Sequence, residues 1–118
     1  MKLYRFLASD RELKDYKFED NSKIISSLDM SIASNYTSKK NCALIEWNYS
    51  EENVDSFIAY IKEHLKMCPR IEIWNPTTNT DNTIRKKCSK NILTKENIKE
   101  VLSTEQFDST KCLVVYNA

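Results

Sequence analysis

The 118-residue sequence contains no glycine, two prolines and one histidine. Without glycine, the chain cannot form the Gly-rich loops that hold phosphate, the dinucleotide-binding fingerprint or the glycine-flanked nucleophile elbow. Turns that require a positive φ must use asparagine or aspartate instead. Two arrangements typical of metal sites, CxxC and HxxxH, are also missing. These absences exclude the commonest phosphate-binding and hydrolytic motifs.

Long apolar runs and a strong net charge are missing as well. No apolar run approaches the roughly 18 residues that a membrane-spanning helix needs, and residues 1–8 are too short and too quickly followed by charges for a signal peptide. Charged residues make up 30% of the chain, and the net charge is +1. We therefore expect a globular cytoplasmic protein without membrane contact, organised as a single domain over residues 1–118.

The strongest pattern in the chain predicts a strand, a helix and a second strand in succession. Residues 43–49 alternate as a half-buried strand does, and residues 54–68 carry apolar side chains at spacings of three and four. Ser50 is a favourable N-cap for this helix, and Pro69 ends it. Alternation resumes in residues 71–74. Together these segments predict a βαβ unit.

A second unit of the same kind follows. Residues 84–90 predict a polar, edge-like strand, residues 94–102 a shorter helix, and residues 112–116 the most apolar strand of the chain. Two βαβ units in tandem give a βαββαβ core, the ferredoxin-like arrangement, within an α+β fold. Both helices then cover one face of an antiparallel or mixed sheet. A larger mixed sheet of another topology is the alternative.

Residues 1–41 are expected to form an N-terminal β extension to this core, which spans residues 42–118. Residues 1–8 predict a strand with apolar side chains on both faces, which suits a strand covered on both sides. Residues 24–32 fit a strand or a helical turn, and we favour the strand. Loops are predicted at residues 9–21 and 35–41. The extension then either enlarges the sheet or covers its open face.

Three cysteines and the histidine form a possible metal site. In the predicted topology Cys42, Cys68 and Cys88 lie at the same end of the sheet, and His64 lies one helical turn before Cys68. Three thiolates and an imidazole would make a closed tetrahedral zinc set. Zinc ligands usually come in short-range pairs, however, and cysteine is a common small core residue. We therefore favour core cysteines, without disulfides in a reducing cytosol, and expect no metal and no cofactor.

Two arrangements could support catalysis, and each has a structural alternative. His64 could activate the thiol of Cys68, but a reactive thiol needs an exposed, electropositive surrounding, and Cys68 continues the apolar stripe. Glu46 and Glu72 could place two carboxylates in one groove for acid–base chemistry. We favour instead a salt-bridge ladder in which the intervening Arg85 or Lys87 pairs with them. The protein is therefore predicted not to be an enzyme.

Six residues are candidates for a partner-binding face. Alternation places all of them on the sheet face opposite the predicted helices. They are Trp74, Tyr116, Glu46, Glu72, Arg85 and Lys87. Aromatic and arginine side chains among mixed charges are typical of protein interfaces. The alternative is that the N-terminal strand and residues 24–32 cover this face and bury the aromatic rings.

By elimination, the sequence favours a protein that binds another protein without catalysis. A stoichiometric neutraliser of bacterial type, such as a toxin-immunity protein, fits a short chain with patchy surface charge. The alternative is an RNA- or nucleotide-binding domain that uses the open sheet face and the basic run Arg85–Lys90. The near-neutral net charge and the absence of the RNP1 pattern make nucleic acid the less favoured partner.

Overall fold

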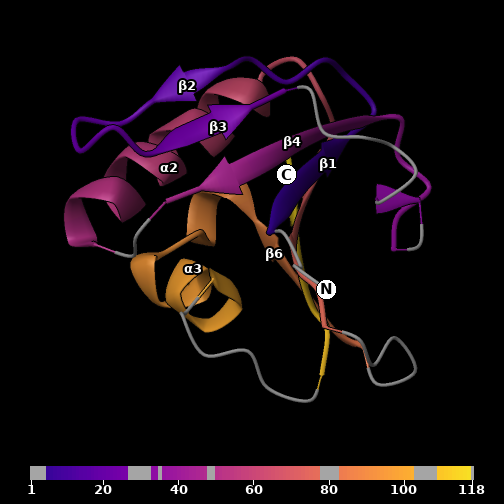
Figure 1. Cartoon of the computed structure of the whole chain (residues 1–118). Helices are drawn as coiled ribbons and strands as arrows, with labels where there is room; N and C mark the ends of the chain where they lie inside the picture. Colours follow the sequence, from indigo (N-terminus) through magenta and orange to yellow (C-terminus); the bar gives the residue numbers. More distant parts are fainter. Residues whose placement is uncertain are drawn as a thin grey trace.

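The computed structural model describes residues 5–26, 33–34, 36–47, 50–77, 83–102 and 109–117. In this part of the chain, seven strands form one mixed sheet, which two α-helices accompany (Figure 1). The elements in order are β1 (Phe6–Ser9), β2 (Tyr16–Lys17), β3 (Lys23–Ile25), β4 (Asn41–Glu46), α2 (Glu51–His64), β5 (Arg70–Asn75), β6 (Ile84–Ser89), the 3-10 helix η1 (Lys90–Ile92), α3 (Lys95–Leu102) and β7 (Lys111–Tyr116).

The strand order across the sheet is β2-β3-β4-β1-β5-β7-β6. Strand β1 lies near the centre, antiparallel to both neighbours, so that Phe6 faces Leu44 of β4 and Trp74 of β5. Strands β6 and β7 pair in parallel, whereas the other paired strands are antiparallel. The sheet is therefore mixed, with β2 at one edge and β6 at the other.

The ferredoxin-like arrangement is not confirmed. In that arrangement each strand–helix–strand unit leaves room for a strand of the other unit. Here the gap between β4 and β5 is filled by β1, while β6 and β7 are direct neighbours. The physical reason lies in the side chains. Every residue of β1 is buried, whereas Ile84 to Lys87 of β6 are exposed, so β1 is suited to the interior and β6 to an edge.

The description of residues 1–41 as an extension is not confirmed for β1, whereas β2 and β3 do add to the sheet beside β4. The predicted strand at residues 1–8 is found as β1, and it is covered on both faces as expected. Because it lies between β4 and β5, it is an internal part of the core. Residues 1–4 lie outside the described residues.

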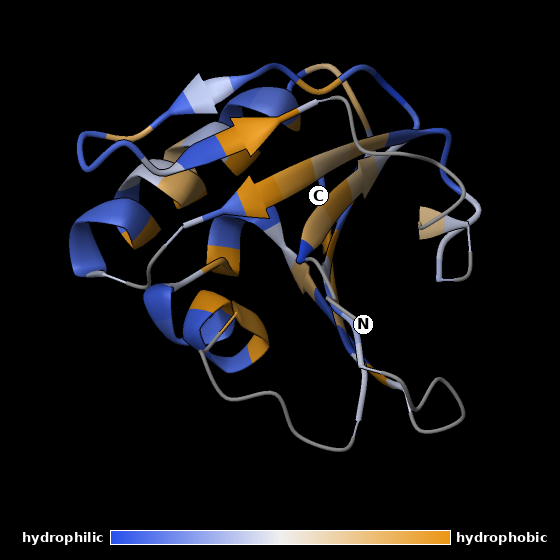
Figure 2. Ribbon diagram, viewed as in Figure 1, coloured by the Kyte–Doolittle hydropathy of each residue, from blue (hydrophilic) through white to orange (hydrophobic). Residues whose placement is uncertain are grey.

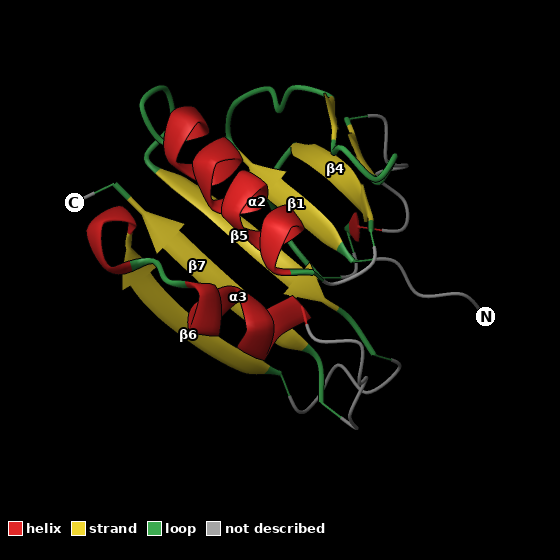
Figure 3. Cartoon of the chain, turned by 90° about the vertical axis from the view of Figure 1, so that its left-hand side faces the viewer, coloured by secondary structure: helices red, strands yellow, loops and turns green. Residues whose placement is uncertain are grey.

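Both helices cover the same face of the sheet, as predicted. Figure 3 shows α2 and α3 side by side in front of the strands. The apolar stripe of α2 packs against side chains that alternate along the strands beneath it. The buried cluster includes Val54, Phe57 and Ile61 of α2, Leu65 directly after it, Ile98, Val101 and Leu102 of α3, and Leu7, Ala43, Ile45, Ile71, Ile73, Leu113 and Val115 of the sheet. Hydrophobic and hydrophilic residues alternate along both helices (Figure 2), as amphipathic helices require.

Side-chain caps are found at the starts of both helices, and the predicted Ser50 cap is confirmed. The Ser50 hydroxyl accepts a hydrogen bond from the backbone N–H of Asn53, at 3.1 Å. At α3, the Thr94 hydroxyl accepts from the N–H of Asn97, and Asn97 Oδ1 accepts in return from the N–H of Thr94. These bonds satisfy donors that the first helical turn leaves unpaired.

The segment before β3 differs in part from the expected loop. It contains the short strand β2, which pairs with β3, and its tight turn places Asn21 at a φ of 71°. Asparagine tolerates this left-handed conformation, as the lack of glycine requires. The predicted strand at residues 24–32 begins as β3, and residues 27–32 lie outside the described residues.

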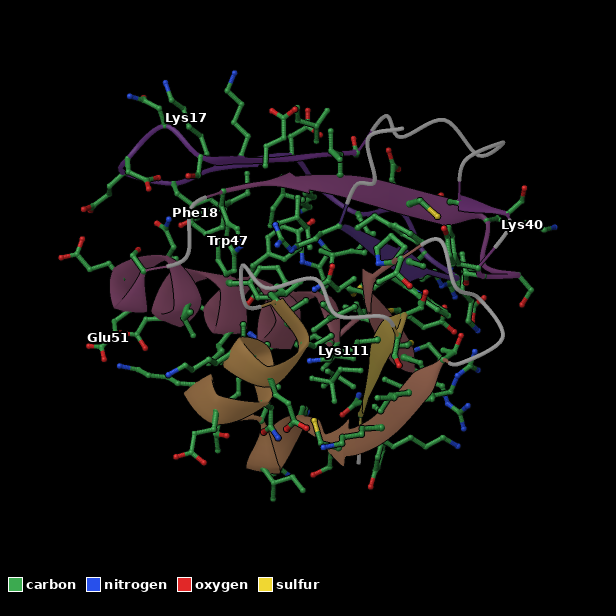
Figure 4. All side chains as sticks on the ribbon, turned by 60° about the horizontal axis from the view of Figure 1, so that its bottom comes forward. Lys17, Phe18, Lys40, Trp47, Glu51 and Lys111 are labelled. Atoms are coloured by element: carbon green, nitrogen blue, oxygen red, sulfur yellow. The ribbon has the colours of Figure 1, made fainter. Side chains whose placement is uncertain are left out.

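A strap formed by residues 13–18 closes over α2. The rings of Phe18 and Trp47 lie close together (Figure 4), with 5.4 Å between their centroids. The centroid of the Trp47 ring lies 4.9 Å from that of Phe57 of α2. The Tyr60 hydroxyl donates to the carbonyl of Lys14 at 2.6 Å.

No described helix has the length and apolar character that a membrane crossing demands.

Candidate interaction surface

All six residues predicted for the partner-binding face lie opposite the helices. On β5, Ile71 and Ile73 belong to the core beneath the helices, so Glu72 and Trp74 face the other way. The registers place the remaining candidates on this same face. The pairing of β5, β7 and β6 places Tyr116 and Arg85 there, and Lys87 lies there because it aligns with Val114. Glu46 lies on this face because it alternates with the core residue Ile45. Strand alternation therefore accounts for the side of the sheet on which these residues lie.

Trp74 is nevertheless buried, with 2% of its surface exposed. Its ring lies nearly parallel to Phe6 at a centroid distance of 6.1 Å, and the ring of Tyr36 lies 6.0 Å away. The Tyr36 hydroxyl donates to the carbonyl of Thr77. A segment that was expected to be a plain loop therefore supplies part of the cover on this face. Trp74 acts as core here and offers no surface to a partner.

Glu72 is held by two hydrogen bonds under the same cover. Its Oε1 accepts from the indole N–H of Trp74 at 2.9 Å and from the hydroxyl of Thr37 at 2.5 Å. These donors come from β5 itself and from the covering segment. The expected ladder is wrong among the described contacts, because Arg85 and Lys87 lie on the edge strand β6 and form no salt bridge with Glu72.

Glu46 lies apart from Glu72. A strand does separate β4 from β5, as predicted, but it is β1. The register also offsets the two glutamates by four residues along the strands, because Leu44 and Trp74 share one row. Strand geometry then places their Cα atoms about 16 Å apart. Glu46 is exposed beside Lys23 of β3, so the two carboxylates do not form an acid–base pair.

A second exposed part of the face lies at its β6–β7 end, away from Glu46. Arg85 and Lys87 of β6 are exposed, and Tyr116 of β7 is 37% exposed. Arg70 joins them because it pairs with Tyr116 and is also exposed. Arg70 is not among the six predicted residues, although its alternation with Glu72 and Trp74 indicates the same face. We call Arg70, Arg85, Lys87 and Tyr116 the cationic end of the sheet.

The three cations of this end carry a local excess of positive charge. Within the described ranges, no salt bridge involves Arg70, Arg85 or Lys87, whereas neighbouring Lys86 pairs with Glu100. The Cζ atom of Arg85 lies 5.4 Å from the centroid of the Trp74 ring. A guanidinium that rests on an aromatic face keeps its edge N–H groups free to bind a carboxylate.

The residues of the possible zinc set are not brought together. Cys42 packs on the face opposite the helices, whereas Cys68 and Cys88 belong to the helix-side core. The two nitrogens of His64 are both engaged. Nε2 accepts from the Lys14 N–H at 3.1 Å, and Nδ1 lies 2.8 Å from the Tyr60 carbonyl, to which it donates. Among the described residues, no group of three potential ligands could hold a metal ion.

The cysteines behave as packed core residues in the described structure. All four are free and buried. Burial, with the nearby Glu72 carboxylate, raises the pKa of the Cys42 thiol to about 11 and that of Cys112 to about 12. Cys68 Sγ accepts from the Ser9 hydroxyl at 3.3 Å and donates to the Arg70 carbonyl. Neither nitrogen of His64 contacts this thiol. The two residues therefore do not form the Cys–His pair that nucleophilic catalysis would need.

One hollow adjoins the cationic end on the helix side of the sheet. It has a volume of about 260 Å³ and lies between α3 and the β6–β7 pair. Its walls include Ile84 and Lys86 of β6, Val101 of α3 and Leu113 of β7.

Comparison with protein-family models, curated proteins and solved structures gave no match to this chain.

Proposed function

We propose that this protein works by binding another protein, without catalysis, through the cationic end of its sheet. The observation that carries the proposal is the grouping of Arg70, Arg85 and Lys87 around the half-exposed ring of Tyr116, with no acidic partner among the described side chains. Arginine and tyrosine are residues that interfaces favour. The partner should therefore present acidic side chains.

A stoichiometric neutraliser, such as a toxin-immunity protein, is the kind of protein that this proposal best fits. Such a protein needs a rigid charged surface and no reacting groups. The cationic end meets the first requirement because its side chains project from paired strands, whose backbones are fixed by the sheet. Preorganised charges lose little conformational entropy on binding, and they steer an oppositely charged partner.

RNA binding is the less favoured function for this surface. Binding of single-stranded RNA commonly uses exposed aromatic rings on which bases stack. Trp74 and Tyr116 are the two aromatic candidates on this face; Trp74 lies beneath Tyr36 and against Phe6, so of these two rings it is Tyr116 that is partly exposed. The basic run Arg85–Lys90 could still attract phosphates, so the experiment below must separate protein from nucleic acid.

Affinity capture from an extract of the source organism tests the proposal. The tagged protein is compared with the double variant R85Q/K87Q, after nuclease treatment and at moderate salt. We expect the wild type to retain a protein that the variant does not retain. The matched control K62Q/K99Q removes two exposed lysines from the outer faces of α2 and α3, and it should retain the same protein as the wild type.

Two outcomes would contradict the proposal. One is a captured protein that binds the wild type and R85Q/K87Q equally, because the cationic end would then play no part. The other is material that depends on Arg85 and Lys87 but disappears with nuclease, because the surface would then bind nucleic acid.

A further inference from the structure

Strand β6 ends the sheet on the side of the cationic end. Its pairing with β7 is parallel, and the N–H of Ile84 donates to the carbonyl of Thr110 at 2.7 Å. In a parallel pair, a residue that bonds the neighbouring strand directs both its N–H and its C=O there, and the next residue directs both away. Ile84, Lys86 and Cys88 therefore bond β7, while the N–H and C=O groups of Arg85 and Lys87 point outward.

The side chains of β6 sort onto the two faces in the same rhythm. Arg85 and Lys87, whose backbone groups point outward, carry their cations on the face opposite the helices. Ile84, which is 44% exposed, and Lys86 lie on the helix face. The hollow of about 260 Å³ lies beside Ile84, and its lining combines the apolar residues Val101 and Leu113 with Lys86, Asn97, Glu100 and Lys111. The edge thus offers cations on one side and, on the other, a hollow whose walls are partly apolar.

We propose that the partner binds by adding an extended acidic segment as a further strand along the outer edge of β6. This inference rests on the function proposed above and specifies how the partner is held. Acidic side chains of the added strand alternate with apolar ones. The acidic ones lie beside Arg85 and Lys87, and the apolar ones enter the hollow beside Ile84.

Charge decides between this occupant and a second copy of the chain. Two β6 edges brought together would place Arg85, Lys86 and Lys87 against the same cations, and like charges directly opposite destabilise strand pairing. Basic residues on an edge commonly prevent such self-association. A strand with glutamates at alternate positions is instead attracted by these cations. The edge therefore excludes copies of itself and accepts an acidic segment.

A short synthetic peptide in which glutamate alternates with valine is the probe for this inference. We expect it to bind the full chain, to bind R85Q/K87Q at least about tenfold more weakly, and to lose affinity as salt rises. A peptide with lysine in place of glutamate should not bind. Methylation of the peptide nitrogens on alternate residues, in the register that faces β6, should also abolish binding, because strand addition requires those N–H groups.

The variant K87P separates strand addition from simple charge attraction. The Lys87 N–H points outward, so proline removes a group needed by an added strand without removing a bond to β7. We expect K87P to keep its circular dichroism spectrum and to bind the peptide at least about tenfold more weakly than K87Q. K87Q is the matched control, because it loses the same charge and keeps the N–H.

The outcomes assign failure to one proposal or the other. If R85Q/K87Q loses the peptide while K87P binds as K87Q does and methylated peptide still binds, the cationic end binds acidic ligands but strand addition is wrong. If K87P misfolds, the methylated peptide alone decides. If the peptide binds R85Q/K87Q as well as it binds the wild type, or binds neither, both proposals are overturned.

Discussion

Glu72 is the residue that joins the covering segment to the sheet. One carboxylate oxygen accepts from Trp74, which is almost fully buried, and from Thr37 of the cover. A buried donor that loses its acceptor keeps the full penalty of its lost hydration. The interaction therefore matters more for what its loss would leave unpaired than for the strength of either bond.

Replacement of Glu72 by leucine should lower the free energy of unfolding by about 1–3 kcal/mol, because the Trp74 N–H would remain buried without an acceptor. Urea unfolding measures this directly. E72Q keeps a carbonyl oxygen in the same place and should lose clearly less. Equal losses in E72L and E72Q would show that the carboxylate charge, and not the hydrogen bonds, stabilises the cover.

The buried thiols predict how stability changes in alkali. The Cys112 pKa is raised from 9.0 to about 12 by burial, with the Glu72 carboxylate as a second cause. Because the pKa is higher in the folded state, the unfolded chain releases this proton first. The stabilisation is present below pH 9.0 and is lost progressively as the pH rises towards about 12.

Urea unfolding between pH 8 and pH 10.5 should therefore show a falling free energy of unfolding above about pH 9. In the variant C112A this decline should be shallower, by up to about 1.4 kcal/mol per pH unit. The comparison concerns slopes, so the packing loss in C112A does not affect it. Identical slopes in the two proteins would contradict the burial of the Cys112 thiol.

At the scale of elements, the strap of residues 13–18 is tied to α2 by Tyr60 and His64. Both side chains reach Lys14, one to its carbonyl and the other to its N–H. The strap carries little regular structure of its own, since β2 has two residues. Its position therefore depends on side chains of the helix.

The variant Y60F should lower the free energy of unfolding by about 1 kcal/mol, because the Lys14 carbonyl loses its 2.6 Å donor. Amide exchange in residues 13–18 should accelerate more than in β5 or β7. Y16F is the control, since Tyr16 is 39% exposed and the change should remain within about 0.5 kcal/mol. Uniform acceleration throughout the protein in Y60F would argue against a local role.

The central position of β1 yields a second prediction at this scale. A fragment of residues 42–118 retains every element of the expected βαββαβ core, but it lacks the strand that pairs with β4 and β5. We expect this fragment to show no cooperative thermal unfolding by circular dichroism, because the sheet would be divided at its centre. A fragment with a cooperative transition would contradict the observed strand order.

At the scale of the whole molecule, local features could be predicted from the sequence and long-range pairing could not. The Ser50 cap, the stripe of α2 and the alternation of Ile73 and Trp74 along β5 all follow from neighbours in the chain. The insertion of β1 between β4 and β5 depends on pairings more than thirty residues apart, which leave no local signal.

The candidate surface was also predictable only in part. Strand alternation identified the face, and it could have added Arg70. It could not reveal that Tyr36 and Thr37 cover part of that face, because the segment around them has neither helical nor strand periodicity. The exposed cationic end can be identified only from the structure, which shows which part of the face is covered.

Amide hydrogen exchange, resolved by residue with NMR, tests the central claim most directly. In the free protein the amides of Arg85 and Lys87 should exchange rapidly, while those of Lys86 and Cys88 are protected by β7. Saturation with the glutamate–valine peptide should slow Arg85 and Lys87 by at least about tenfold and leave the other two unchanged. If Arg85 and Lys87 are already protected in the free protein, or do not change on saturation, β6 is not an open edge that receives an acidic strand.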